Sequence, residues 1–212
     1  MKNIVLSAVA VFAMSSFAVA GGDIAPIEEP EVVVEEVAAP AWSPKFYIGA
    51  GYVNVAGTIE DNLGDTDLTA DNYALAAGMI INQYLAIEGR YSNSFSDATV
   101  EPANGPEVDL PGGEAEVAAI FAKPMYPVTD QFIVYGLVGY ANVSVSDDNV
   151  DNYMDDDGLA YGLGAAYAVN ANVLVFADWT RLYDDTVEDT ASALDGLDVT
   201  VDTFNIGVAY VF

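Results

Sequence analysis

Eight stretches of the chain alternate between large apolar side chains and small or polar ones, and this period of two limits what the chain can fold into. In an extended strand, successive side chains point to opposite faces, so each stretch has one apolar face. The last stretch ends in FNIGVAYVF, residues 204–212. The stretches cover residues 45–58, 70–81, 84–96, 114–126, 132–146, 158–169, 173–186 and 197–212. We predict eight β-strands, paired as four hairpins.

The connections between these strands are of two kinds, which alternate along the chain. Residues 82–83, 127–131 and 170–172 make tight turns. The longer connections are rich in Asp and Glu and cover residues 59–69, 97–113, 147–157 and 187–196. An up-and-down meander with such connections places all tight turns at one end and all acidic loops at the other, as in transmembrane barrels. Both ends of the domain then lie on the tight-turn side.

Within the strands, large side chains share one face and glycine or alanine fills the other. In residues 158–169, for example, Leu159, Tyr161 and Leu163 alternate with Ala160 and Gly162. A soluble barrel points its bulky side chains inward and carries charges outside. Here the bulky face has almost no charge, so lipid is its expected solvent. The prediction is an all-β fold, an eight-stranded antiparallel up-and-down transmembrane β-barrel over residues 45–212.

A few charged residues lie within the strands and are assigned to the lumen by the parity of their neighbours. We predict a buried ionic network in the lumen of Glu88, Arg90, Glu116 and Asp178. The network either fills the interior and fixes the register, which we favour, or gates a narrow water path. Lys123 and Arg181 have the opposite parity, so we expect both to face outward near strand ends and reach the membrane interface.

Aromatic side chains cluster at two levels along the strands, as the interface girdles of membrane barrels do. The predicted girdle residues near the tight turns are Phe46, Tyr84, Tyr126, Phe132 and Tyr167, and those near the acidic loops are Tyr52, Tyr73, Tyr91, Tyr161, Trp179 and Tyr183. Scattered core aromatics are the alternative, which clustering at two levels disfavours.

The first 44 residues read as targeting and linker segments. Residues 1–20 have Lys2, an apolar core over residues 4–17 and a small-x-small end at residues 18–20, which predicts a cleaved secretory signal peptide. The apolar core is shorter than a membrane-spanning helix. Residues 21–44 are rich in Pro, Glu and Val and predict an acidic periplasmic linker, either a plain spacer, which we favour, or a docking segment.

Composition excludes several classes of function. The chain has no histidine, which removes Ser/His/Asp and Cys/His nucleophilic sites and His-bound zinc. It has no cysteine, so disulfides do not hold it. After loss of residues 1–20, four basic and 33 acidic residues remain, a formal charge of 4 − 33 = −29. Nucleic acid is therefore not an expected partner.

The alternating residues Phe204, Ile206, Val208, Tyr210 and Phe212, with the segments YIGAGY at 47–52 and YGLGAAY at 161–167, resemble small bacterial outer-membrane barrels. The resemblance is to eight-stranded porin-family proteins with OmpA-like or OmpX/opacity-type domains and covers residues 45–212. It implies that the C-terminal residues are an assembly signal for the outer-membrane barrel assembly machinery, and that lipid surrounds the barrel. No peptidoglycan-binding domain follows Phe212, so cell-wall anchoring is not expected. Enzymes of related families use a histidine, which this chain lacks.

One acidic loop begins like a calcium site, at residues 147–151. The glycine required at the sixth position is Asn152 and the closing glutamate is Gly158, so we reject an EF-hand and allow only weak divalent-cation binding at the acidic loops.

Three functions follow from these patterns. The first is a monomeric outer-membrane barrel with a structural, surface-exposed role, acidic extracellular loops, no cofactor and no catalytic activity. The second is a narrow, low-conductance channel. The third is a secreted soluble lipocalin-like barrel that binds small ligands.

Overall fold

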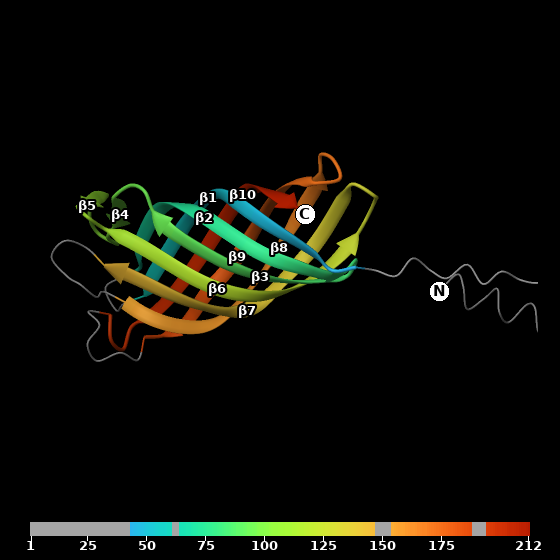
Figure 1. Cartoon of the computed structure of the whole chain (residues 1–212). Helices are drawn as coiled ribbons and strands as arrows, with labels where there is room; N and C mark the ends of the chain where they lie inside the picture. The colour runs from blue at the N-terminus through green and yellow to red at the C-terminus, as the bar shows by residue number, and fades with distance from the viewer. Residues whose placement is uncertain (1–42, 61–63, 147–153, 188–193) are drawn as a thin grey trace, which may run out of the picture. The chain divides into compact units, whose positions relative to one another are not determined.

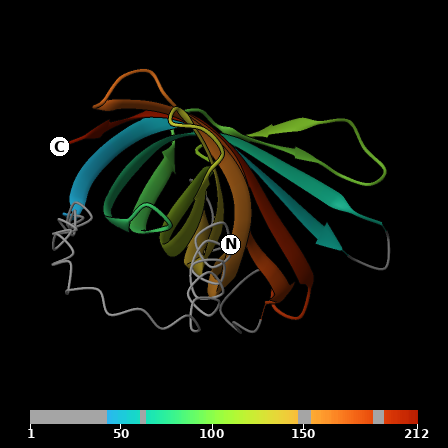
Figure 2. The ribbon, with the colours of Figure 1, turned by 90° about the vertical axis from the view of Figure 1, so that its right-hand side faces the viewer.

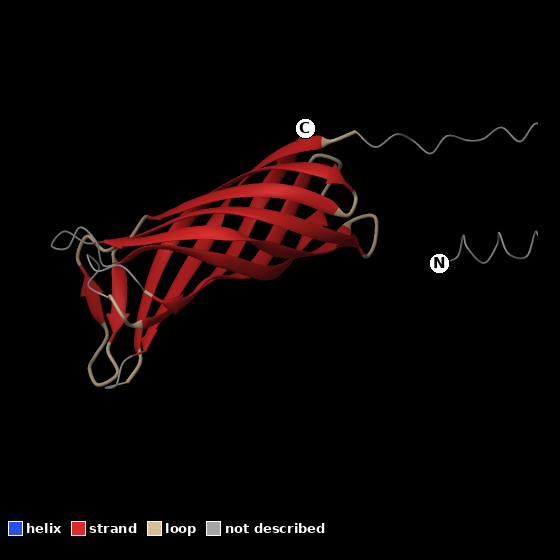
Figure 3. Cartoon of the chain, turned by 90° about the horizontal axis from the view of Figure 1, so that it is seen from below, coloured by secondary structure: helices blue, strands red, loops and turns tan. Residues whose placement is uncertain are grey.

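The computed structural model describes residues 43–60, 64–146, 154–187 and 194–212. The predicted signal peptide, residues 1–20, and nearly all of the predicted linker, residues 21–44, lie outside the described residues, and so does the acidic segment 147–151. The described residues form β-strands joined by turns and loops (Figure 3). No helix among these described residues is long and apolar enough to cross a membrane.

Eight long strands form one closed antiparallel barrel (Figures 1 and 2). Around the barrel, the strands follow the order β1-β10-β9-β8-β7-β6-β3-β2, and β2 pairs with β1. The long strands are β1 (Lys45–Glu60), β2 (Thr66–Asn82), β3 (Leu85–Ser94), β6 (Glu114–Pro127), β7 (Phe132–Ser146), β8 (Met154–Ala168), β9 (Val173–Thr186) and β10 (Asp198–Val211). Two short strands, β4 (Ala98–Glu101) and β5 (Val108–Leu110), form a hairpin that pairs with β2 through β4.

The barrel closes between the first and the last strand. β1 pairs with β10 from Tyr47 opposite Val211 to Glu60 opposite Asp198. Every other neighbour in the barrel is the next long strand along the chain, which confirms the predicted eight-stranded up-and-down topology. The C-terminus lies at the end of the barrel with the tight turns, where the backbone N–H of Phe212 donates to the carbonyl of Phe46 (Figure 1).

The hairpin of β4 and β5 occupies a segment, residues 97–113, that the sequence predicted to be a loop. β2 begins at Thr66, four residues before its predicted start, and β3 ends at Ser94. The outer end of β2 would therefore present unpaired backbone groups. β4 pairs with this end, with Asp67 opposite Glu101 and Thr69 opposite Thr99, and satisfies those groups.

The two faces of the barrel wall have the arrangement that the alternation predicted. Leu75, Leu163 and Val208 point outward and are 52%, 70% and 51% exposed, whereas Ala160 and Ala209 point inward and are buried. The exposed side chains form an apolar outer surface that water would solvate poorly. Alanine and glycine line only part of the interior, because larger side chains such as Val55, Phe121 and Leu137 are buried there as well.

One strand, β6, has the opposite parity from the one we predicted. Val117, Phe121 and Lys123 are buried in the interior, whereas Glu116 and Ile120 are exposed on the outside. The prediction that Glu116 faces the lumen is therefore wrong, as is the prediction that Lys123 faces outward. Small residues occupy both faces of this strand, so size did not decide its parity, and Glu116 lies close enough to the long-loop end for its carboxylate to face water.

A bulge in β9 corrects a second prediction. Tyr183 lies opposite Val201 and Arg181 lies opposite Asp202, so Leu182 is an extra residue on β9. The extra residue reverses the parity beyond it. Tyr183 therefore points inward and is buried, so it is not a girdle residue. Arg181 lies before the bulge and is partly exposed.

Candidate functional site in the barrel lumen

Arg90 on β3 is the centre of an ion-pair network inside the barrel. Its Nε–H donates to Glu88 Oε1 over 2.6 Å. Its two terminal nitrogens, Nη1 and Nη2, donate to Asp178 Oδ1 and Oδ2 over 2.7 and 2.8 Å. This two-pronged contact joins β3 to β9, which lies on another side of the barrel. Charge-assisted contacts of this geometry are among the stronger hydrogen bonds in proteins.

Lys123 on β6 supplies the second positive charge. Its Nζ lies 2.8 Å from Glu88 Oε2 and 4.0 Å from the centre of the Tyr135 ring, a distance typical of a cation–π contact. Two cations thus balance the carboxylates of Glu88 and Asp178, so the network carries no net charge. A balanced group is what burial requires, because an unpaired charge inside a protein is costly.

Two tyrosines complete the hydrogen bonds of the carboxylates. The Tyr47 hydroxyl donates to Glu88 Oε2, and the Tyr135 hydroxyl donates to Asp178 Oδ2 over 2.7 Å. Each of the four carboxylate oxygens consequently accepts at least one hydrogen bond. We call Tyr47, Glu88, Arg90, Lys123, Tyr135 and Asp178 the lumen network.

The lumen network contains the same arrangement on two sets of three adjacent strands. A tyrosine on the first strand lies opposite a glycine on the second, and its hydroxyl contacts a carboxylate on the third. Tyr47 on β1 lies opposite Gly78 on β2, and its hydroxyl reaches Glu88 on β3. Tyr135 on β7 lies opposite Gly164 on β8, and its hydroxyl reaches Asp178 on β9.

The glycine in each pattern gives the tyrosine its room. A Cβ at Gly78 would overlap the Tyr47 ring, and one at Gly164 would lie 2.6 Å from the Tyr135 ring. Each tyrosine therefore lies across the glycine of the neighbouring strand to reach a carboxylate on the strand beyond it.

Two cavities lie inside the barrel on either side of the lumen network. The one toward the tight turns has a volume of about 490 Å³ and touches Glu88, Lys123 and Tyr135. The one toward the long loops has a volume of about 390 Å³ and shares no lining residue with the first. Beside Arg90 there is a space of only about 30 Å³, which is close to the volume of one water molecule. The lumen is thus divided rather than open from end to end.

The structure brings together three of the four residues predicted to form the ionic network: Glu88, Arg90 and Asp178. Glu116 is not among them, and Lys123 takes part instead. Charge balance could have identified Lys123, because two buried carboxylates and one arginine leave a net negative charge that a second cation must neutralise. The two tyrosines were not predicted as members of the network, because only charged residues within the strands were assigned to it.

No group of three or more His, Cys, Asp or Glu side chains is placed to hold a metal ion in the part of the chain that the structure describes.

A family model of the outer membrane protein β-barrel domain matches residues 4–212, which is nearly the whole chain. This chain belongs to the outer-membrane β-barrel family. The match agrees with the closed barrel and with the apolar side chains on its outer face. No curated protein matches the chain significantly.

Solved structures of small outer-membrane barrels share the fold. Neisserial surface protein A (NspA) is 19% identical, with a TM-score of 0.56 over 81% of this chain and 100% of NspA. OprG of Pseudomonas aeruginosa is 17% identical, with a TM-score of 0.53 over 80% of this chain and 96% of OprG. Ail, the attachment invasion locus protein of Yersinia pestis, is 18% identical, with a TM-score of 0.50 over 81% of this chain and 100% of Ail.

The outer surface of this outer-membrane barrel carries aromatic residues near both ends of the strands. Ten of the eleven predicted girdle residues are exposed there: Phe46, Tyr52, Tyr73, Tyr84, Tyr91, Tyr126, Phe132, Tyr161, Tyr167 and Trp179. Tyr161 and Trp179 meet edge to face, with their ring centres 6.3 Å apart. Their role at the membrane interfaces remains a prediction.

The C-terminal strand presents its predicted assembly residues on one face. Phe204, Ile206, Val208, Tyr210 and Phe212 are all exposed on the outside, and the rings of Tyr210 and Phe212 pack 5.2 Å apart. Assembly machinery that approaches the outer face of β10 would meet these side chains. Their recognition as an assembly signal remains a prediction.

Arg181 also lies on the outer surface, as predicted, but its partners are protein carboxylates. Its Nε and Nη2 donate to the two Asp202 oxygens over 3.0 Å each, and its Nη1 donates to Asp184 over 3.0 Å. These carboxylates pair with all three guanidinium nitrogens of Arg181, so Arg181 needs no partner from the membrane interface.

Proposed function

We propose that this protein is a structural, surface-exposed barrel of the bacterial outer membrane, without catalytic activity, which reaches that membrane through the predicted signal peptide. The observation that carries the proposal is the closed lumen network. It joins strands on different sides of the barrel, it is electrically neutral, and it separates the two cavities. Such a network fixes the barrel wall and leaves the lumen without a continuous path.

The surface toward the long loops supports a role at the cell surface. Acidic side chains are exposed on the outer ends of many strands: Asp67, Glu114, Glu116, Asp155, Asp157, Asp184 and Asp198. In barrels of this type the long loops are extracellular. We propose that these carboxylates set a negative surface potential, which attracts cations, including divalent cations with low affinity, and repels polyanions.

The negative charge of this surface distinguishes the protein from one structurally similar barrel that has been solved with a bound ligand. Ail has been solved in complex with the heparin analogue sucrose octasulfate, which is a polyanion. The four basic residues after the signal peptide include Arg90 and Lys123, which are committed to the lumen network. A polyanion is therefore not the partner that we propose for this barrel.

The absence of histidine and cysteine from the sequence supports the non-catalytic part of the proposal. Glu88 and Asp178 are the buried carboxylates of the lumen, and both are held by cations and tyrosines. A carboxylate in that state is poorly suited to take a proton from a substrate.

Single-cysteine labelling in intact cells tests the proposed location and orientation. The chain has no cysteine, so each introduced thiol is unique. We expect Glu107→Cys, in the β4–β5 hairpin, to react with a membrane-impermeant maleimide, and Asp130→Cys, in a tight turn, to react only after the outer membrane is permeabilised. Membrane fractionation of the same cells should recover both variants with the outer membrane. Recovery in the soluble fraction would contradict the proposal.

A narrow channel is the second candidate, because cavities of about 490 and 390 Å³ already occupy the lumen on both sides of the network. Conduction would require the ion pairs of Arg90 to open. We expect the purified wild-type protein to give no single-channel currents in planar bilayers. Discrete currents from the wild type would favour the channel over a purely structural barrel.

The third candidate, a soluble lipocalin-like barrel, is disfavoured by the exposed apolar side chains around the whole barrel wall. Extraction of the folded protein without detergent would support it.

A further inference from the structure

The polarity of the two wall faces reverses along the barrel axis. In the middle of β7, Val138 and Tyr140 point outward and are exposed. Toward the long loops, Val143 and Val145 of the same strand point inward and are buried, while Asn142 is exposed. The same change occurs in β10, β8 and β2. There, the inward residues are Val199, Val201, Met154 and Leu68, and their outward neighbours are Asp198, Asp155, Asp157 and Asp67.

This reversal indicates that the outer ends of the strands stand in water. Seven of the long strands have 14 to 17 residues, more than the roughly 9–11 that a strand needs to cross a bilayer. A barrel segment surrounded by water has its charges outside and its apolar side chains inside, as a soluble ligand-binding barrel does. The barrel segment beyond the membrane therefore has the same distribution of charged and apolar side chains as a soluble ligand-binding barrel.

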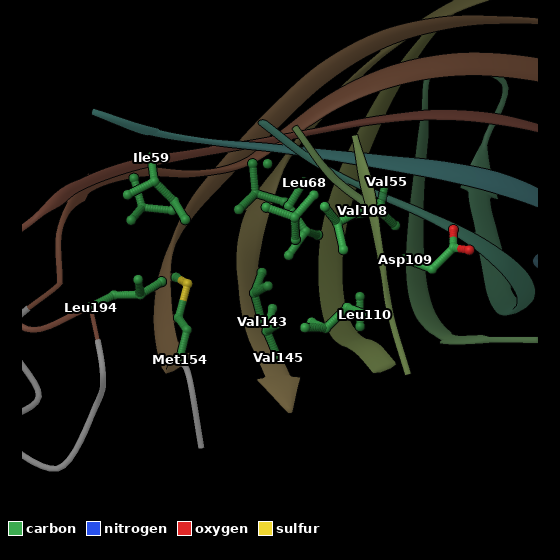
Figure 4. A pocket seen from close by; sticks show the side chains of 15 residues that line it. Val55, Ile59, Leu68, Val108, Asp109, Leu110, Val143, Val145, Met154 and Leu194 are labelled. Atoms are coloured by element: carbon green, nitrogen blue, oxygen red, sulfur yellow. The ribbon is translucent and has the colours of Figure 1, made fainter. Parts of the chain in front are cut away.

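The interior of this segment contains an open cavity whose inner wall is made of buried core side chains. The cavity has a volume of about 390 Å³. Aliphatic side chains surround it, and Figure 4 shows those of Val55, Leu68, Val143, Met154 and Leu194 gathered from separate strands and a loop. Protein interiors normally leave few voids larger than one water molecule. A void of this size is within the range of small-molecule sites and is more than twice an apolar cavity of about 150 Å³ that binds benzene.

Two features of the chain keep the cavity open and partly covered. Gly57 faces it from β1, and a Cβ at this position would have no neighbour closer than 3.8 Å, so a side chain there would fit. The β4–β5 hairpin contributes Val108 and Leu110 to the lining. The hairpin extends the wall of the cavity beyond the outer end of β2, with which β4 pairs.

The negative charge around the cavity determines which head group an apolar ligand can carry. The one charged residue among its lining residues in the described part of the chain is Asp109, which Figure 4 places to one side of the apolar cluster. Exposed carboxylates surround the barrel at this level, including Asp67, Asp155 and Asp198. An anionic ligand would be repelled, whereas a positive head group would be attracted.

We propose that this cavity is a binding site for a small cationic amphiphile, whose apolar tail lies among the valines and whose head group lies among the carboxylates at the rim. Tail burial supplies the affinity, because apolar surface leaves water for a preformed apolar space. The acidic rim supplies the selectivity against fatty-acid-like anions.

Methyl NMR of the full-length mature protein in phospholipid nanodiscs tests the proposal. The probe is octyltrimethylammonium, and the comparison is octyl sulfate, which has the same tail and the opposite charge. We expect saturable shifts of the Val55, Val143 and Val201 methyls with the cation, and an affinity at least about tenfold lower for the anion. Lipid-facing methyls, such as those of Val138 and Val208, report partition into the bilayer and should shift without saturation.

Two variants that fill the cavity complete the test. Gly57→Val and Val143→Phe each place added carbon atoms in the space for the tail, and should weaken cation binding by about tenfold. Val138→Phe makes the same change as Val143→Phe on the lipid-facing side of β7 and should leave binding unchanged. Heat-modifiable gel mobility shows which variants are folded. Equal affinity for the two amphiphiles, shifts confined to lipid-facing methyls, or unchanged binding in a folded cavity-filling variant would overturn the proposal.

Discussion

At the scale of single residues, the lumen network depends on six side chains. Each of them has a hydrogen-bond or ion-pair partner within the network. Arg90 contacts both buried carboxylates, and no other cation reaches Asp178 within ion-pair distance among the described residues. The sequence was sufficient to predict that Glu88, Arg90 and Asp178 would meet, because their parity places all three inside a narrow barrel. It was insufficient for Lys123, because parity within β6 is ambiguous when both faces of the strand carry small residues.

Removal of Arg90 should destabilise the barrel strongly. Arg90→Ala leaves Asp178 buried with only the Tyr135 hydroxyl as a partner, and breaking a buried ion pair in this way costs roughly 3–5 kcal/mol. The measurement is urea unfolding in phospholipid vesicles, followed by tryptophan fluorescence, with Trp42 replaced by Phe in every variant so that the signal comes from Trp179. Arg181→Ala is the matched control, because Arg181 is partly exposed, and we expect a loss below about 1 kcal/mol. Equal losses in the two variants would contradict the role of the lumen network.

The glycines opposite the lumen tyrosines should not accept a methyl group. Gly164→Ala would bring Cβ to 2.5 Å from the Asp178 Cβ and 2.6 Å from the Tyr135 ring, and overpacking of this kind costs about 1–3 kcal/mol. Gly89→Ala is the control, because its Cβ would meet nothing closer than 3.9 Å. The same unfolding measurement should show a large decrease for the first and little change for the second. A decrease of the same size in both variants would contradict the steric clash at Gly164 as its cause.

At the scale of strands, the sequence predicted best the strands whose two faces differ most in the size of their side chains. In β8 and β10, bulky residues alternate with glycine or alanine. Lipid on the outer side of the wall favours bulky apolar side chains there, so the two faces are easy to tell apart in the sequence. Three features were not predictable from alternation. The Leu182 bulge adds one residue without any local change in composition, β8 begins at Met154 inside an acidic run, and the β4–β5 hairpin has too few residues to show a period.

The β4–β5 hairpin should be dispensable for assembly of the barrel. It pairs only with the outer end of β2, and the wall closes through β1 and β10 without it. Replacement of residues 97–111 by a short Gly/Ser linker should preserve heat-modifiable mobility and lower the midpoint of urea unfolding only slightly. Loss of the heat-modifiable form would show instead that the hairpin is required for the wall to close.

At the scale of the whole molecule, the barrel faces two solvents and encloses two cavities along its axis. Lipid contacts the apolar belt, water contacts the acidic outer rim, and the neutral lumen network separates two cavities inside. The reversal of polarity at the long-loop end was not apparent from the sequence, because the valines there alternate in the same way as those in the membrane. Their burial in the closed barrel shows which of them face inward.

Assembly of the whole molecule should depend on its last residue. Phe212 is exposed on the outer face of the closing strand, beside Tyr210. If the assembly machinery recognises this face, deletion of Phe212 should lower the amount in the outer membrane and increase degradation in the periplasm. Quantitative immunoblots of fractionated cells measure both. A deletion variant present at wild-type levels in the outer membrane would contradict the predicted assembly signal.

The outward direction of the bulky face is the claim on which the other conclusions depend, and spin-label accessibility measures it directly. Because the chain has no cysteine, single nitroxide labels can be placed at Ile206 and Val208, which face outward, and at Asn205 and Ala209, which face inward. In lipid vesicles, we predict that oxygen, which concentrates in the bilayer, relaxes the labels at 206 and 208 much more than those at 205 and 209. Equal relaxation at all four positions, or greater relaxation at 205 and 209, would contradict the account.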